Sequence, residues 1–450
     1  MPSVTDTLPD EVLVAILAAL PLLERHRTAA AVCRRWRQLC NSAPQLLRGI
    51  GASFADNPRG VGRLCPFCTW LLRHAPGRVE RLSLEVLLAE DGLEGGTTKQ
   101  EALWTTTAAL AACGAAGALT GLQLLGWIGQ PSVWAGGMCC LRWLRIHAWD
   151  REDVQLWSPP PGTLPCLQRL ELAGDVCFEP SVHLPAGLTK LHLDCREQGM
   201  QEPLPVQLTT LKHLHTLSLE YGNVGLDFVA RLPSLRRLSL LKSFSWPACT
   251  AELTGLEALV LDNSQVTVRD GASATAAVAA ALPRLQRLTH LVLGWPERGG
   301  FSCPAELAAV SSLRSFAWLH PRGELPLGPW AARLQRLVTR ADQLAGVAAA
   351  LPAAAPRPQL LGVWCDECEP QQVESVLRCR TRLPAMQRVV LAGSEALFMR
   401  CLPALLAAQR EAPHACIETL AGLEWQAFWC ACGCESGCAP LSHEAFLAAE

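Results

Sequence analysis

The chain has 450 residues, of which 50% are hydrophobic and 18% charged, a composition typical of folded domains with large cores. Its formal net charge of −2 argues against nucleic acid or an acidic membrane as a general electrostatic partner. We find no stretch of 18 uninterrupted apolar residues, so no membrane span is predicted. The apolar run from Val12 to Leu23 follows acidic residues and lacks the basic flank of a secretion signal. We therefore expect a cytoplasmic or nuclear protein with reduced cysteines.

The first 37 residues contain two amphipathic helical patterns. Pro9 suits the first turn of a helix, and Asp10 and Glu11 follow where carboxylates favour the helix dipole. Apolar residues then recur at helical spacing until Pro21 breaks the helix. These apolar residues are Val12, Leu13, Ile16, Leu17 and Leu20. A second pattern places Ala29, Val32, Cys33 and Trp36 on one predicted face.

This segment resembles the F-box, the helical module that docks onto the Skp-family adaptor of SCF ubiquitin ligases. The resemblance rests on Leu8-Pro9-Asp10-Glu11, Leu20-Pro21 and Val32-Cys33-Arg34-Arg35-Trp36-Arg37. The sequence departs from the usual pattern at Leu46, where many F-boxes place a tryptophan. The resemblance implies binding to an Skp-family adaptor and, through it, to a cullin. The residues expected to carry this docking, or the packing that shapes it, are Leu8, Pro9, Glu11, Val12, Ile16, Leu17, Leu20, Pro21 and Trp36.

Elementary packing also favours a docking role for the first helix. A module of about 40 residues is too short to bury a self-sufficient core. The helix is apolar around more than half its circumference, so one face must meet something besides the second helix. Each buried Leu or Ile would contribute about 1.5–3 kcal/mol, enough for a helix to bind in a partner's groove. The alternative is a helical cap over the open end of the domain that follows.

Beyond residue 78 the sequence repeats the signature Leu-x-x-Leu-x-Leu. Clear copies begin at Leu167, Leu188, Leu214, Leu235, Leu256 and Leu288, and looser copies at Val79, Leu119, Leu141, Leu313, Leu334, Leu360 and Met386. Most successive starts lie 21 to 26 residues apart, within the range of leucine-rich repeats. The predicted fold class is α/β: a leucine-rich-repeat solenoid, a horseshoe with a parallel concave sheet, preceded by a small all-α F-box-like helical module. The predicted domains are 5–48 (F-box-like), 49–78 (linker and N-terminal cap), 79–425 (solenoid) and 426–450 (Cys-rich C-terminal cap).

Residues between the buried leucines line the sheet face on which such repeats bind partners. We call the position just before the second Leu the first column and the next outward position the second column. The candidate target-binding residues are Arg81, Trp143, Arg169, Lys190, Arg237, His290, Arg336 and Arg388 in the first column and Arg145 and His192 in the second. The first column leans basic, and the second becomes aliphatic beyond Val260. This suits an acidic or phosphorylated segment with a hydrophobic anchor; the alternative is a solvated face whose charges keep the strands soluble.

Four cysteines close to the C-terminus could in principle hold zinc: Cys430, Cys432, Cys434 and Cys438. Their spacing lacks the paired Cys-x-x-Cys of zinc knuckles, so we predict no metal and no cofactor. No P-loop, Gly-x-Ser-x-Gly or His-Glu-x-x-His motif is present, which argues against catalysis. The best interpretation is a substrate receptor for an unknown target protein. A repeat scaffold with a helical cap is the alternative, and a metal-dependent enzyme at the C-terminal cysteines comes third.

Overall fold

The computed structural model describes most of the chain. The described residues are 8–20, 22–54, 58–74, 76–86, 99–126, 134–147, 155–157, 160–174, 176–178, 183–195, 205–220, 226–241, 252–262, 276, 278–294, 303–319, 325–340, 360–364, 370–379, 388–393, 395–411 and 416–421. The chain divides between His213 and Leu214 into two compact units. Among the described residues, unit 1 consists of those up to His213 and unit 2 of those from Leu214 onward, and each unit is described by itself.

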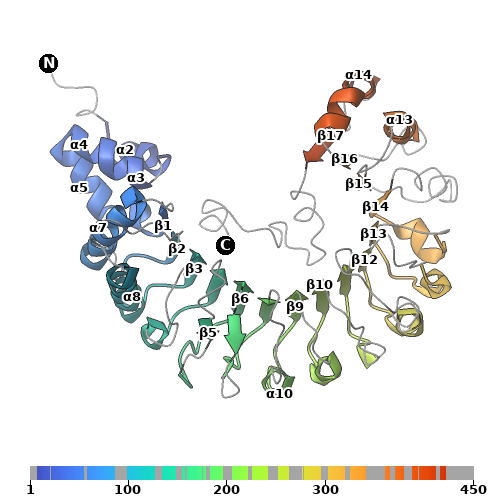
Figure 1. Cartoon of the computed structure of the whole chain (residues 1–450), viewed down its shortest axis with the longest axis horizontal. Coiled ribbons are helices and arrows are strands. Elements are labelled where there is room, and N and C mark those ends of the chain that lie inside the picture. The colour runs from blue at the N-terminus through green and yellow to red at the C-terminus, as the bar shows by residue number, and fades with distance from the viewer. Residues whose placement is uncertain are drawn as a thin grey trace. The chain divides into compact units, whose positions relative to one another are not determined.

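Unit 1 begins with a bundle of short helices (Figure 1). Its elements are α2 (Asp10–Ala18), α3 (Leu22–Glu24), the π-helix η1 (Arg25–Ala29), α4 (Ala30–Val32), α5 (Arg34–Ser42) and α6 (Pro44–Leu47). The second helical pattern expected from the sequence is not one helix. Cys33 is extended, with φ −156° and ψ 172°, and separates α4 from α5. Val32 and Trp36 therefore do not share one helical face as predicted, because periodicity cannot detect a single extended residue between two helices.

The rest of unit 1 is built on a parallel sheet. Its strands, in spatial order, are β1 (Gly49–Phe54), β2 (Arg81–Val86), β3 (Gly121–Gly126), β4 (Trp143–His147), β6 (Arg169–Gly174) and β8 (Lys190–Cys195). A second sheet pairs β5 (Gln155–Trp157) with β7 (Val176–Phe178). The other elements are α7 (Pro58–His74), α8 (Lys99–Ala115), the 3-10 helix η2 (Ala135–Gly137) and α10 (Pro205–Leu208).

Strand β1 was not anticipated from the sequence. It lies in the segment expected to be a linker and cap, and it pairs in parallel with β2, with Ile50 opposite Leu82. Ile50, Ala52 and Phe54 are buried and alternate with more exposed neighbours, as a strand covered on one face requires. The segment carries this alternation without the Leu-rich signature, so a search for that signature missed it.

Unit 2 repeats the same design (Figure 1). Its strands are β9 (Thr216–Glu220), β10 (Arg237–Leu241), β11 (Ala258–Asp262), β12 (His290–Gly294), β13 (Ser315–Leu319), β14 (Arg336–Arg340), β15 (Leu360–Trp364), β16 (Arg388–Gly393) and β17 (Cys416–Ala421). The elements between them are the 3-10 helices η3 (Leu226–Arg231), η5 (Leu282–Arg284), η7 (Ala305–Ala309) and η8 (Pro329–Arg333), and the helices α13 (Pro370–Cys379) and α14 (Glu395–Glu411).

Equivalent positions of successive repeats lie opposite one another in both units. Leu238 of β10, for example, lies opposite Leu217 of β9 and Leu259 of β11, and all three are buried. In most repeats from β1 to β13 the carbonyl before the strand accepts two N–H groups from the next repeat: the Arg142 carbonyl, for example, accepts from Gln168 at 2.9 Å and Arg169 at 3.0 Å. Each repeat thus completes the backbone bonding and the core of its neighbour. Both units are leucine-rich-repeat solenoids.

Candidate functional site

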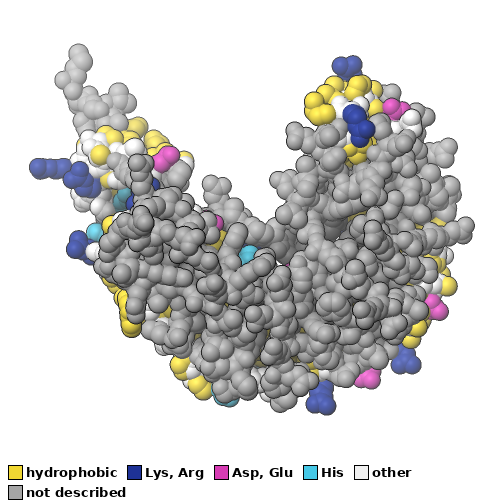
Figure 2. All heavy atoms as spheres, in the orientation of Figure 1, with side chains coloured by type: hydrophobic (Ala, Val, Ile, Leu, Met, Phe, Trp, Pro, Cys, Tyr) yellow, Lys and Arg dark blue, Asp and Glu magenta, His cyan; other side chains and the backbone are white. Residues whose placement is uncertain are grey.

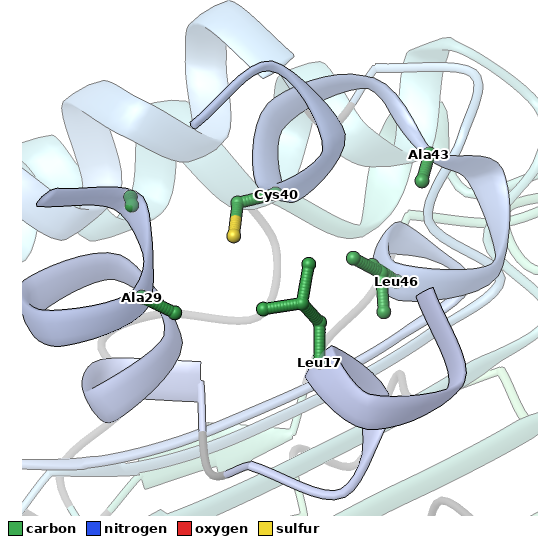
Figure 3. Close-up of a cluster of buried hydrophobic side chains, with 6 residues drawn as sticks. Leu17, Ala29, Cys40, Ala43 and Leu46 are labelled. Atoms are coloured by element: carbon green, nitrogen blue, oxygen red, sulfur yellow. The ribbon is translucent and has the colours of Figure 1, made fainter. Parts of the chain in front are cut away.

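The N-terminal helices enclose a small core of their own. Leu17 of α2 meets side chains from α5, α6 and the π-helical segment, and the labelled side chains point toward one another (Figure 3). The core consists of Leu17, Ala29, Ala30, Cys40, Ala43 and Leu46, with Val14, Leu20, Trp36 and Leu39 packed against it. Leu46, at the position where many F-boxes have tryptophan, is 1% exposed. The smaller side chain is accommodated inside this core.

A buried arginine links three of these helical segments. Arg25 is 8% exposed and donates 3.0 Å hydrogen bonds to the Leu20 carbonyl after α2 and to the Leu46 carbonyl in α6. Burial lowers the pKa of Arg25, with the Cys40 thiol acting in the opposite direction. A planar guanidinium can serve both carbonyls at once, so Arg25 fixes the end of α2 against α6. No local pattern in the sequence predicts this role.

The start of α2 is held by a surface ion pair. Arg35 of α5 donates from Nε to the Asp10 carboxylate at 2.9 Å and from Nη2 to the Leu8 carbonyl at 2.6 Å. Asp10 also lies in the first turn of α2, where its charge favours the helix dipole. The residues of the Leu-Pro-Asp-Glu start are therefore oriented by a residue of the Val-Cys-Arg-Arg-Trp-Arg motif.

The predicted docking residues divide into an exposed set and a packing set. Val12 is 42% exposed and Ile16 44%, one turn apart on α2, whereas Leu13 and Leu17 are completely buried. Val32 is 59% exposed on the same module, and Figure 2 shows apolar side chains on the module's surface beside basic ones. Pro9 and Glu11 are exposed, and Leu8, Leu20 and Trp36 are half-buried. Leu17 can therefore act only through packing, and Pro21 lies outside the described residues.

The helical module packs against α7, and this contact leaves the module's own exposed apolar residues uncovered. His26 lies edge-on to Trp70 of α7 with ring centroids 4.7 Å apart, and Trp70 Nε1 donates to Asn41 Oδ1 at 3.2 Å. Burial, then Arg25 and His74, lower the pKa of His26 to about 4. The module thus makes the contacts of a cap through His26 and Asn41, while Val12 and Ile16 stay free.

Comparison with known proteins decides the nature of this module. A family described as F-box-like matches residues 5–50. These residues form an F-box-like domain. The F-box-like domain is followed by leucine-rich repeats, so the chain joins the two modules that the sequence predicted.

The likeness to solved structures is distant. Among the solved structures that resemble the chain is a plant peptide hormone receptor, RGFR1, in complex with RGF2, with 12% identity and a TM-score of 0.29. The match covers 86% of this chain and 65% of the receptor chain, so this protein spans less than two thirds of that receptor's length. No curated protein matches the sequence.

The open face of the repeat sheet in unit 1 carries a compact charged cluster. We define the open face as the one bearing the first and second columns. Arg145 Nε lies 3.5 Å from Glu171 Oε2, Arg169 binds the other oxygen of that carboxylate, and the Arg169 guanidinium lies 4.5 Å over the Trp143 ring. Burial alone would raise the pKa of Glu171, but Arg169, Arg145 and His192 together lower it. Glu171 is therefore ionised and neutralises much of the local basic charge.

The candidate target-binding residues differ in accessibility. Trp143, Arg169 and His192 are half-buried, Lys190 is exposed, and Arg145 is only 8% exposed. In unit 2, Arg336 is exposed and Arg237 and His290 are half-buried. Arg81 is half-buried at the start of β2, and Arg388 begins β16. Each candidate of the first column thus begins a strand, as its position in the repeat requires, but Arg145 is engaged chiefly within the fold.

The cysteines show no metal site in the part of the chain that the structure describes. Across those ranges no group of three or more His, Cys, Asp or Glu side chains could hold a metal ion. Burial raises the pKa of Cys68 to about 11, which keeps its thiol protonated. Cys430, Cys432, Cys434 and Cys438 lie outside the described residues. The described helices include none long and apolar enough to cross a membrane.

A further exposed apolar surface, not predicted from the sequence, lies on α14. On α14, Met399 is 64% exposed, Leu402 42% and Leu406 49%. These residues follow helical spacing on one side of α14, so a periodicity count over residues 395–411 would have found them. On α8, Trp104 is 62% exposed.

Proposed function

We propose that this protein is the substrate-recognition subunit of an SCF-type ubiquitin ligase. The F-box-like domain would bind a Skp-family adaptor, and through it a cullin, while the leucine-rich repeats bind a target protein. The chain itself would be non-catalytic and need no cofactor. Ubiquitin transfer would be carried out by the other subunits, because holding the target near them raises its effective concentration.

The exposed apolar pair on α2 is the observation that supports this proposal. Val12 and Ile16 are each more than two-fifths exposed on a helix whose other apolar side is fully buried. The module's own core and its contacts with α7 use other residues, so these two side chains are left for a partner. A cap without a docking role would bury the apolar side chains of α2 more completely.

Co-purification with a Skp-family adaptor tests the proposal. Co-expression should yield a complex with the full chain, and a Val12→Glu/Ile16→Glu variant should lose it because carboxylates replace the apolar contact. Ala18→Glu is the matched control, since Ala18 is exposed on a different side of α2. A folded protein that ignores the adaptor would support the alternative, a leucine-rich-repeat scaffold with no ligase connection.

A further inference from the structure

Three cysteines of unit 1 lie close together in the turns that lead into β4 and β6. Cys139 and Cys140 are adjacent in the chain, with their Sγ atoms 3.9 Å apart, and Cys166 belongs to the next repeat. Cys139 and Cys166 are exposed, Cys140 is half-buried, and none of the three is in a disulfide. Two of the three side chains therefore add little to the hydrophobic core, so core packing does not explain this cluster.

The strand register makes Cys140 and Cys166 equivalent residues of successive repeats. β4 pairs with β6 with Trp143 opposite Arg169, and each cysteine lies at the same distance in sequence before its paired strand residue. Just beyond the cysteines, the Arg142 carbonyl accepts the N–H of Gln168 at 2.9 Å. The two backbones are therefore already in hydrogen-bonding contact next to the two thiols.

The turn that carries these cysteines has the same hydrogen bond in three successive repeats. In each repeat the N–H of the first leucine of the signature donates to the carbonyl three residues earlier. These bonds join Leu141 to Met138 at 3.3 Å, Leu167 to Leu164 at 3.1 Å and Leu188 to Pro185 at 3.2 Å. The local geometry of one turn is therefore a guide to that of the next.

The third of these turns shows where a side chain at the cysteine position points. Gly187 is the residue equivalent to Cys166 in the following repeat. A Cβ atom on Gly187 would lie 3.5 Å from the Leu167 carbonyl oxygen and 3.8 Å from the Pro165 carbonyl oxygen, which flank Cys166 in the chain. By the same geometry, the side chain of Cys166 lies against the backbone that flanks Cys140.

This arrangement suits a disulfide between Cys140 and Cys166. Disulfides join residues whose Cα atoms are about 4.4–6.8 Å apart, and neighbouring strands of a sheet are about 4.8 Å apart. Adjacent residues such as Cys139 and Cys140 have Cα atoms only about 3.8 Å apart, which is too close for an unstrained bridge. The pair that spans the two repeats is therefore the favoured one.

The electrostatics agree with this proximity. The Cys139 thiol, chiefly through its hydrogen bond, raises the pKa of Cys140; Cys166 acts in the same direction and Arg142 in the opposite one. Cys166 is therefore near enough to influence the Cys140 thiol, which keeps its proton. Because Cys166 is exposed, it is the thiol of this pair that a dissolved oxidant reaches first.

We propose that Cys140 and Cys166 form a reversible oxidation site, a disulfide that bridges two successive repeats when the protein meets hydrogen peroxide. The Cys166 thiolate attacks the peroxide, so that an S–O bond forms, the O–O bond breaks and hydroxide leaves, taking up a proton to become water. The Cys140 sulfur then attacks this sulfenic sulfur: the S–S bond forms, the S–O bond breaks, and the hydroxyl group leaves with the Cys140 proton as a second water. The two thiols lose two electrons, which the peroxide gains, and a dithiol reductant reverses the bridge.

Peptide mapping of the full chain tests this site. The chain is treated with an equimolar amount of hydrogen peroxide, its remaining thiols are blocked, and it is digested with trypsin for mass spectrometry. The bridge would join the peptide that ends at Arg142 to the peptide that ends at Arg169. This cross-linked species should form in the unaltered chain and disappear after treatment with dithiothreitol. A chain that yields no such species would overturn the proposal.

Three serine variants identify the sulfur atoms that take part. Cys140→Ser and Cys166→Ser should each lower the yield of the cross-linked species at least about ten-fold, whereas the matched control Cys139→Ser should retain it. Undiminished cross-linking in Cys140→Ser would place the bridge on Cys139 and contradict the assignment. Because Cys166 is exposed, Cys166→Ser tests the bridge without disturbing the core. The mapping needs no adaptor, so its outcome is independent of the function proposed above.

Discussion

Arg25 offers a sharp test of how the F-box-like domain is held together. Its guanidinium is the shared donor to the Leu20 and Leu46 carbonyls, each at 3.0 Å. Replacing Arg25 with alanine removes both donors and leaves the Leu20 and Leu46 carbonyls without these hydrogen bonds. The Arg25→Ala variant should therefore loosen the end of α2 from α6.

The expected magnitude follows from those two bonds. Hydrogen bonds from a charged donor contribute about 1.5–3 kcal/mol each. Removing a buried cation offsets part of the loss, because burial disfavours the charged form of Arg25. We expect Arg25→Ala to lower the opening free energy of the domain by about 2–4 kcal/mol. Arg25→Lys should give an intermediate loss, since an ammonium cannot reproduce the planar fork.

Hydrogen exchange of the amides in α2 and α6 measures this opening free energy in the full chain. Arg34→Ala is the matched control, because Arg34 is exposed on α5, and it should change the value by less than about 0.5 kcal/mol. If Arg25→Ala opened no more readily than Arg34→Ala, the assigned role of Arg25 would be refuted.

Three further predictions concern packing and charge. Leu17→Ala should lower the domain's opening free energy by about 2–5 kcal/mol, with no such loss for Val12→Ala in the same exchange experiment. Glu171→Gln should destabilise unit 1 by about 3 kcal/mol in chemical denaturation, because the buried guanidinium of Arg145 and the half-buried one of Arg169 lose their counter-charge; an unchanged midpoint would contradict this. The folded pKa of His26 lies below its unfolded value, so domain stability should fall as pH drops from about 6.5 to 4. In His26→Gln that part of the pH dependence should disappear.

The repeat signature predicted the strands well because it combines two periodicities. The leucines mark the buried face of each strand, and the spacing of copies marks the stacking. Even the irregular copies at Leu313 and Met386 lead into β13 and β16. Strand β1 escaped because Ile50 and Ala52 replace the leucines, although the two-residue alternation was present.

The functional positions could be predicted only in part. The sequence marks Val12, Ile16 and Leu17 as apolar residues of one helix, but only their packing shows which two are exposed. The buried role of Arg25 depends on carbonyls five and twenty-one residues away, which no local pattern reveals. The sequence already shows that the second column becomes aliphatic beyond Val260, but the contacts of Glu171 with Arg145 and Arg169 were needed to show that it neutralises arginines in unit 1.

The affinity of the full chain for a purified Skp-family adaptor, compared with that of Val12→Ala/Ile16→Ala, tests the central claim most directly. Burying the exposed parts of both side chains should contribute about 2 kcal/mol in total, so the double variant should bind about 30-fold more weakly in calorimetry. If the double variant bound the adaptor as tightly as the unaltered chain, docking through this surface of α2 would be contradicted. It would also be contradicted if neither protein bound the adaptor.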